Sequence, residues 1–403
     1  VIMKYAKILN NRGVVNMFKE YQHLRIPGPT PIAPQVQRAM ERTILGHRSG
    51  EFSKIFAETA VKAKKIFQTK QEVFVVASSG TGALEMAVAN IVEPEDKVLV
   101  IVTGVFGGRF VKIAKAYKAD VVELHFEYGR AADPEQVRQV LKQNPDIKAV
   151  FATHCETSTG VVNPIKELAQ VVKESNAVFV VDSVSALVGM DLKMDEWGVD
   201  IAVTASHKAL GLPPGLALIA VSEKAWKVID QHQGPRFYWD LVAYKTNAAK
   251  NTTPFTGPVS LVFGLSQSLD LIEEEGLAEG FKRHFLLRDM VRKAATALGL
   301  ELFVQKDKDA SCTVTAIKGD DRFDVEALRK VLRQDYKIEA AGGQADMKGK
   351  IFRIGHMGYT HPMDILTTIA GLEMALKQLG VPIELGTGIK AAEEVWTNAK
   401  NIG

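Results

Sequence analysis

Short runs rich in valine and isoleucine alternate with segments of helical periodicity from about residue 70 to about residue 205. This alternation is typical of βαβ units, whose strands lie parallel in one sheet with helices packed on both of its faces. The sequence therefore predicts an α/β fold with a doubly wound, mostly parallel sheet. The predicted strands are Glu72–Val76, Lys97–Val102, Val121–Leu124, Lys148–Thr153, Val178–Asp182 and Ile201–Thr204. The predicted helices are Ala83–Ile91, Gly108–Lys118, Pro134–Gln143 and Pro164–Glu174.

A second structural unit is predicted from about residue 280 to about residue 380, where strands and helices are mixed. We expect an N-terminal extension over residues 1–23, a large domain over residues 24–275 and a smaller C-terminal α+β domain over residues 276–403. The Thr- and Pro-rich stretch Asn251–Pro258 should form a loop, and Ile389–Asn398 should form a terminal helix. The strands predicted in this unit are Ser311–Ile317 and Lys350–Ile354, and the helices are Val325–Arg333 and Asp364–Gln378.

The charge balance and the cysteine content limit the classes of partner and compartment. With 50 basic and 47 acidic residues the formal net charge is +3, which argues against nucleic acid as the main partner. No apolar run approaches the roughly 20 residues of a membrane helix, so no membrane association is expected. Two cysteines, Cys155 and Cys312, are too few for a disulfide framework and favour a reducing, cytoplasmic location. Residues 1–19 lack acidic side chains and are interpreted as an extension, with a transit peptide as the alternative.

The loop that follows the first predicted strand has the composition of an anion-binding site. It reads Ser-Ser-Gly-Thr-Gly over residues 78–82 and leads directly into a predicted helix. Backbone N–H groups at a helix N-terminus, together with the helix dipole, favour a phosphate group there. The loop is neither a Walker A motif nor a dinucleotide fingerprint, because Gly-Lys-Ser/Thr is absent and Glu85 stands at the third glycine position. A simple tight turn is the alternative interpretation.

An acidic residue ends one predicted strand, and a lysine follows the next. Asp182 ends an apolar strand, where burying a carboxylate is costly unless a cation or a donor meets it. Lys208 is flanked by small residues, and burial would lower its pKa and free its amine to attack a carbonyl carbon. The alternatives are a helix cap or metal ligand for Asp182 and an exposed loop lysine for Lys208. With the anion-binding loop, the pair matches the needs of pyridoxal phosphate (PLP): a Schiff-base lysine, an acid for the pyridinium nitrogen and a phosphate cradle.

Several short motifs follow one another along the chain. They are Pro27–Thr30, Thr81–Glu85, His154–Gly160, Asp182–Val184, Ser206–Leu210 and Arg353–Gly355. In this order they resemble the motifs of class V aminotransferases, which belong to the fold type I superfamily of PLP enzymes. The alanine–glyoxylate and serine–pyruvate aminotransferases are the group that the chain resembles most. The resemblance extends over about residues 24 to 380.

The resemblance implies a role for each residue around the cofactor. Lys208 would form the Schiff base, and Asp182 would contact the pyridine nitrogen. Val184 and Phe106 would pack on opposite faces of the ring, while Thr157 would hydrogen-bond the phenolic oxygen. The residues expected to hold the phosphate are Ser79, Gly80, Thr81 and His207.

The resemblance also implies a substrate clamp and a partner subunit. Arg353 would bind the α-carboxylate of the substrate through its planar guanidinium, and Gly28 would line the same pocket. The chain would form a homodimer with shared active sites. In that dimer, Thr256 from the Asn251–Pro258 segment would reach the phosphate bound to the other subunit.

The resemblance therefore implies a PLP-dependent aminotransferase that moves an amino group from alanine or serine to glyoxylate or pyruvate. A class V lyase or cysteine desulfurase is the alternative, with Cys312 as its catalytic thiol. Because Cys312 falls in a predicted strand, a buried structural cysteine is favoured instead. A non-catalytic subunit that retains the fold is a further alternative. No metal site is expected, since His356 and His361 lack a third ligand nearby.

Overall fold

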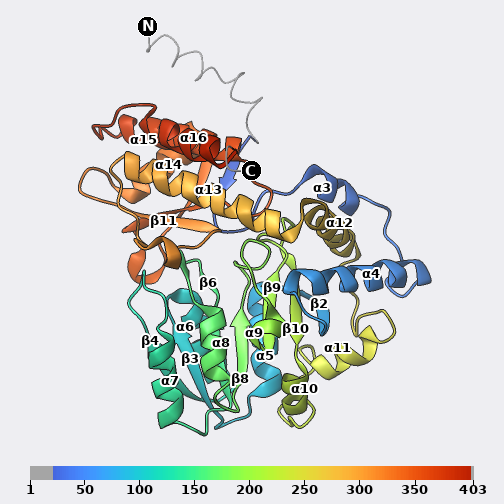
Figure 1. Cartoon of the computed structure of the whole chain (residues 1–403). Coiled ribbons are helices and arrows are strands. Elements are labelled where there is room, and N and C mark those ends of the chain that lie inside the picture. The colour runs from blue at the N-terminus through green and yellow to red at the C-terminus, as the bar shows by residue number, and fades with distance from the viewer. Residues whose placement is uncertain (1–20, 401–403) are drawn as a thin grey trace.

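The computed structural model describes residues 21–400, and its central element is a seven-stranded sheet (Figure 1). The strand order is β2-β10-β9-β8-β5-β3-β4. Strands β3, β4, β5, β8 and β9 run parallel, whereas β10 is antiparallel to both of its neighbours. The prediction of a mostly parallel sheet is confirmed. The strands are β2 Glu72–Ser78, β3 Lys97–Val102, β4 Asp120–His125, β5 Ala149–Thr153, β8 Val178–Asp182, β9 Ile201–Ala205 and β10 Gly215–Val221.

Strand β10 is missing from the sequence-based prediction. It is a continuous apolar run that follows Pro213 and Pro214, and it pairs with β9 on one side and β2 on the other. Antiparallel neighbours need only a short connection, whereas parallel neighbours need a long crossover. The connection between β9 and β10 is therefore a short loop held at both ends by the sheet. Lys208 lies in this loop.

Helices cover both faces of the central sheet, as a doubly wound fold requires. One apolar core includes Phe52 of α4, Leu168 of α8 and Phe263 of α12. The core on the opposite face includes Leu84 of α5 and Phe110 of α6. The helices of this part are α3 Pro34–Met40, α4 Gly50–Phe67, α5 Gly80–Ile91, α6 Val105–Ala116, α7 Pro134–Gln143, α8 Ile165–Val172, α9 Met194–Trp197, α10 Glu223–Ile229, α11 Leu241–Ala248 and α12 Val259–Glu275.

A second, four-stranded sheet with the order β1-β12-β13-β11 forms the C-terminal α+β part. Its first strand, β1 (His23–Arg25), precedes the large unit in sequence and pairs in parallel with β12 (Ile338–Gly342). Helices α13 to α16 pack with this sheet around a separate apolar core. A domain boundary between residues 275 and 276 remains a prediction. The other elements are β11 Val314–Lys318, β13 Ile351–Gly355, α13 Leu277–Ala297, α14 Val325–Asp335, α15 Pro362–Gln378 and α16 Thr387–Lys400.

The strand predicted over Ser311–Ile317 begins later, at the start of β11. The backbone N–H of Ser311 donates to the carbonyl of Gly160 at 2.9 Å, and that of Thr313 donates to the Ser311 hydroxyl at 3.0 Å. These bonds replace the ladder bonds that the prediction assumed. Cys312 therefore lies in a loop ahead of the strand.

The loops at the carboxyl ends of the parallel strands face the second sheet. Helix α5 starts directly after β2, and α6 starts directly after β3. A small hairpin, β6 (Cys155–Glu156) with β7 (Val161–Val162), follows β5 and contacts the segment before β11. In open α/β sheets this edge is where ligands bind. Among residues 21–400, no helix is both long enough and apolar enough to cross a membrane.

Candidate functional site

A cavity of about 220 Å³ lies at the carboxyl ends of β8 and β9. Its walls come from the loop before α5, the first turns of α6, the end of β8 and the connection between β9 and β10. These segments are far apart in the sequence, and the sheet brings them together. The predicted site residues that line this cavity are Ser79, Gly80, Thr81, Phe106, Asp182, Val184, His207 and Lys208.

Lys208 points into this cavity from the loop between β9 and β10. The residue is only 8% exposed, and its Nζ donates to the carbonyl oxygen of Pro27. The Thr30 hydroxyl fixes the backbone of the lysine by donating to its carbonyl at 2.8 Å. Burial lowers the pKa of Lys208 to about 8. Far more of the neutral, nucleophilic amine is therefore present at neutral pH than for an exposed lysine.

Asp182 ends strand β8 and lines the same cavity. It is 4% exposed, and its carboxylate accepts a hydrogen bond from the backbone N–H of Val184 at 2.9 Å. Burial raises the pKa of Asp182 to about 6. No residue within 21–400 forms an ion pair with this carboxylate. A buried acid without an ion-pair partner fits a cationic ligand group, because such a group would restore the ionised form.

The loop before α5 forms a narrow cradle. Ser79 is the N-cap of this helix, and its hydroxyl accepts from the Gly82 N–H at 3.4 Å. A Cβ atom on Gly80 would lie 3.0 Å from the side chain of Val184, so a larger residue there would press on that side chain. His207 lines the same cavity, and its buried Nδ1 atom has no hydrogen-bond partner within the described chain. Free N–H groups and an unpartnered imidazole nitrogen suit an anionic group.

Phe106 is held at the start of α6 by a buried glutamate. The Glu156 carboxylate accepts from the backbone N–H groups of Phe106 at 2.9 Å and Gly107 at 3.1 Å. It also accepts from the N–H and hydroxyl of Ser158. The residue is 0% exposed, and a Cβ atom on Gly104 would lie 2.5 Å from its carboxyl carbon. Glu156 therefore accepts from two N–H groups in the first turn of α6 and holds the backbone from which the Phe106 ring projects.

Arg353 is a buried cation on β13 of the second sheet. Its guanidinium donates to the carbonyl of Gly342 at 2.7 and 2.9 Å and to the carbonyl of Thr157 at 2.6 Å. Burial lowers the pKa of Arg353 to about 10, so the group stays charged at neutral pH. It forms no ion pair with the residues that the structure describes. The bonds to Thr157 place this cation beside the hairpin that borders the cavity.

Gly28 lies against the side chain of Lys208. Its φ angle is +125°, and a Cβ atom there would lie 2.8 Å from Nζ of Lys208. Any side chain at this position would therefore displace the amine. The backbone of residues 27–28 is thus one wall of the space around Nζ.

The two cysteines differ in their relation to the cavity. Cys155 lines the cavity, and its thiol is 3.1 Å from the hydroxyl of Ser311. Cys312 is buried, and burial raises its thiol pKa to about 12. A thiol that is neutral and enclosed is a poor nucleophile. Neither cysteine forms a disulfide, and residues 21–400 contain no cluster of three potential metal ligands.

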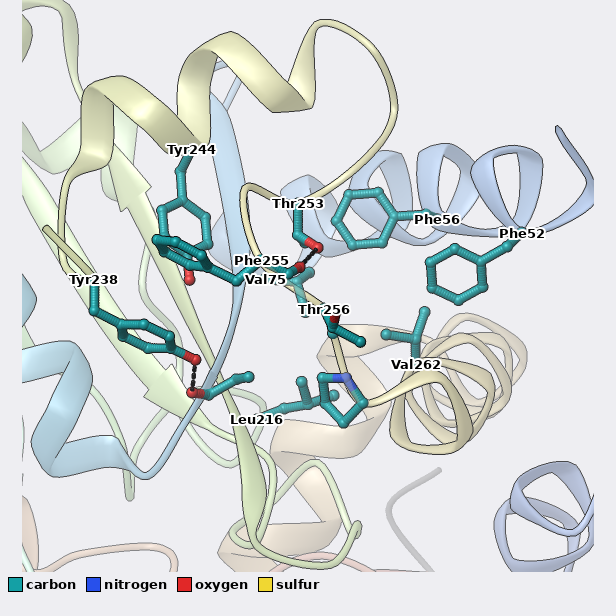
Figure 2. Close-up of a pocket in the computed structure, with 13 residues that line it drawn as sticks. Phe52, Phe56, Val75, Leu216, Tyr238, Tyr244, Thr253, Phe255, Thr256 and Val262 are labelled. Carbon is teal, nitrogen blue, oxygen red and sulfur yellow. Dashed lines mark hydrogen bonds between the residues drawn. The ribbon is translucent and has the colours of Figure 1, made fainter. Parts of the chain in front are cut away.

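Thr256 does not lie in the cavity of its own chain. Its hydroxyl is 3.5 Å from Nε2 of His47, and the residue is exposed. Figure 2 shows the crevice beside it, where Phe52 and Phe56 of α4 face the 253–256 segment. The volume of this crevice is about 10 Å³, room for no more than one water molecule. Thr256 therefore needs a second subunit if it is to reach a bound phosphate.

Comparison with known proteins identifies the family. The family model described as "Aminotransferase class-V" matches residues 33–360. The chain belongs to the class-V aminotransferase family. An uncharacterized aminotransferase of Methanocaldococcus jannaschii is 45% identical over 374 residues, which are 92% of this chain and 97% of the relative.

Two further relatives have names that state a reaction. A serine–glyoxylate aminotransferase of Methylorubrum extorquens is 36% identical over 380 residues, covering 92% of this chain and 94% of the relative. The crystal structure of a pyridoxamine–pyruvate aminotransferase from Mesorhizobium loti superposes with a TM-score of 0.90 at 33% identity. It covers 93% of this chain and 97% of that one. These matches confirm the predicted aminotransferase class and the fold.

Sequence reasoning missed some residues that the structure places at the site. Glu156 stands in a motif of the resemblance, but only the structure shows that its carboxylate holds Phe106. Arg109 lines the cavity one turn after Phe106, and Ser185 lines it beside Val184. The spacing of Phe106 and Arg109 within one helix was the available signal, since residues three apart share a helix face.

Proposed function

We propose that this class-V aminotransferase uses PLP to move an amino group from a small amino acid, alanine or serine, to glyoxylate or pyruvate. The observation that carries the proposal is the pairing of a buried lysine with a buried acid around one cavity. Lys208 and Asp182 have pKa values displaced toward neutrality, to about 8 and about 6. Perturbed groups in one cavity are typical of catalytic sites. The names of the relatives support the substrate class.

The residues of the cavity fit PLP. The unpartnered Nδ1 of His207 and the cradle at Gly80 suit the phosphate, and the acid without a cation suits the ring nitrogen. Val184 and Phe106 are the residues proposed to enclose the ring, and Thr157 to bond its phenolic oxygen. Lys208 would hold the cofactor through Nζ. When bound, PLP supplies an aldehyde carbon that links to amines and a ring that accepts the electron pair of the α-carbon.

The chain's own residues would act on the substrate as follows. Arg353 would bind the α-carboxylate with the two N–H groups that its bonds to backbone carbonyls leave free. Lys208 Nζ would then remove the proton from the substrate α-carbon as a base and return a proton as an acid. Asp182 would stay ionised beside a protonated ring nitrogen. Lys208 and Asp182 are both buried, and hydrogen bonds and ion pairs are stronger in such low-dielectric surroundings than in water.

A reconstitution experiment tests this function. The purified chain should absorb in the violet after addition of PLP, and an amino donor should bleach that band. Alanine, serine and aspartate should be tested as donors with glyoxylate and pyruvate as acceptors, because a pocket distinguishes one methylene by only about 1–3 kcal/mol. A chain that binds PLP but transfers no amino group would contradict the proposal. Release of sulfide from cysteine would instead favour a desulfurase.

Replacing Arg353 by lysine is expected to raise KM strongly for every carboxylate substrate. A lysine ammonium cannot match the paired donors of the guanidinium, and loss of a charged hydrogen-bonded contact costs about 1.5–3 kcal/mol. KM should therefore rise by roughly 10- to 100-fold. Arg138→Lys is the matched control, because Arg138 forms a surface ion pair with Glu135 on α7. An unchanged KM in Arg353→Lys would remove this residue from the substrate site.

We also propose a cytoplasmic homodimer with shared active sites. Thr256 is exposed and lies outside the cavity of its own chain, and the neighbouring Phe237 is 81% exposed. A second subunit would cover this apolar side chain. Thr256→Ala should weaken PLP binding several-fold in the dimer, as measured by cofactor release on dialysis. Unaltered cofactor affinity in a verified dimer would count against shared sites.

A further inference from the structure

Arg109 occupies the end of the cavity next to the loop before α5. Its Nη1 atom donates to the Thr81 hydroxyl at 2.8 Å. Its Cζ atom lies 4.7 Å from the centre of the Phe106 ring, in a cation–π contact. The side chain is partly buried and lines the cavity. One guanidinium therefore contacts both the first turn of α5 and the ring of Phe106.

The charges of the cavity wall are few. Among its lining residues, the charged groups are Lys208, Asp182 and Arg109. His207 also lines the cavity, but burial lowers its pKa to about 4, so this imidazole is neutral at pH 7. Arg109 forms no ion pair with any carboxylate in residues 21–400. It is the one cation of this lining other than the lysine amine.

We infer that Arg109 binds the phosphate group of the cofactor and supplies most of the positive charge that this group requires. The inference rests on the proposed use of PLP. A phosphate monoester carries about −1.5 to −2 charges at pH 7, whereas a helix N-terminus offers the equivalent of about +0.5. Ser79, Thr81 and the backbone N–H groups are neutral donors. The bond from Nη1 to Thr81 leaves further N–H groups of Arg109 free to bond phosphate oxygens.

A purely structural role makes a different prediction. If Arg109 only supported Phe106 and Thr81, its loss would weaken binding of the ring whether or not a phosphate were attached. If Arg109 binds the phosphate, its loss would weaken the binding of the phosphorylated compound only. Pyridoxamine phosphate and pyridoxamine differ by this one group and form no covalent bond to a lysine amine. Their binding to the cofactor-free protein therefore separates the two roles.

The experiment compares wild type, Arg109→Gln, Arg109→Lys and Lys112→Gln by titration calorimetry on cofactor-free protein. Lys112 is an exposed cation on the same helix and serves as the control. We expect Arg109→Gln to raise the Kd of pyridoxamine phosphate by about 10- to 100-fold, the range of one charge-assisted hydrogen-bond set. The Kd of pyridoxamine should change by less than about twofold. Arg109→Lys keeps the positive charge but loses the paired N–H donors of the guanidinium. Its Kd for pyridoxamine phosphate should therefore lie between those of wild type and Arg109→Gln.

Each other outcome has a definite meaning. If Arg109→Gln binds pyridoxamine phosphate and pyridoxamine with equally increased Kd values, or with unchanged Kd values, the phosphate role of Arg109 is overturned. Thermal melting of each variant without ligand shows whether the fold is intact, and Arg109→Lys preserves the test if Arg109→Gln is unstable. Failure of wild type to bind pyridoxamine phosphate or PLP would contradict the proposed function itself.

Discussion

Replacing Lys208 by alanine is expected to lower turnover by at least about 10³-fold and to leave the fold intact. The amine is the group that would hold the cofactor and move the substrate proton, and no other lysine lines the cavity. The variant loses a buried amine that is costly to desolvate, and the methyl group of alanine carries no such cost. We therefore expect an unchanged circular dichroism spectrum and a melting temperature no lower than that of wild type.

The measurement is single-turnover transfer with each donor, followed by absorbance in the violet. Lys227→Ala removes an exposed lysine on α10 and should behave as wild type. Wild-type turnover in Lys208→Ala would refute the mechanism. Loss of turnover together with unfolding would be resolved by Lys208→Met, which retains most of the side-chain volume.

Replacing Asp182 by asparagine should cost about 10²–10³-fold in turnover. An amide is neutral, so it cannot keep a proton on the nitrogen of the cofactor ring, and the ring would accept electrons from the α-carbon less readily. The hydrogen bond from the Val184 N–H can persist, because the amide oxygen also accepts. The first half-reaction, followed as the rate of bleaching by a donor amino acid, measures the effect directly. Asp230→Asn, an exposed acid at the end of α10, is the control.

The pH dependence of stability distinguishes this loss from damage to the fold. The pKa of Asp182 is raised from 3.8 to about 6 in the folded, cofactor-free protein. The folded state therefore holds its proton more tightly than the unfolded chain, and this residue lowers stability as pH rises from about 4 to about 6. Asparagine removes that cost. Above pH 6 the cofactor-free Asp182→Asn variant should melt at or above the temperature of wild type, and a clear drop would indicate structural damage.

The regular elements were largely predictable from the sequence, because their signals are local. The strands Lys97–Val102 and Val178–Asp182 and the helix Pro134–Gln143 have the predicted bounds. Continuous apolar runs mark strands buried on both faces, and proline at the first position marks a helix start. Helix α5 begins at Gly80, before its predicted start. The two glycines at this point indicate a turn when the sequence is considered alone. The Asn251–Pro258 segment is a loop, as its composition indicates.

Other features depended on distant contacts. Strand β10 was missed because a short apolar run cannot be told from a buried helix segment by periodicity alone, and its pairing with β9 and β2 appears only in the sheet. The segment around Cys312 was assigned to a strand, yet its backbone bonds elsewhere. Glu156 was not recognised as the residue that holds Phe106, because the two residues are 50 positions apart in the sequence. Arg109 was passed over because its relation to Thr81 appears only when α5 and α6 lie side by side.

The sequence by itself determined the class of the fold, the order of the strands in the chain, and the loop residues that we propose as carriers of the chemistry. Those properties follow from hydrophobic period and from motifs read over a few residues. Only the tertiary structure decided that Lys208 and Asp182 line one cavity, that Arg353 of the second sheet bonds the Thr157 carbonyl in the hairpin beside it, and that Thr256 lies outside it. Burial and proximity shift pKa values and leave charges without partners, and both arise from contacts between residues far apart in the chain.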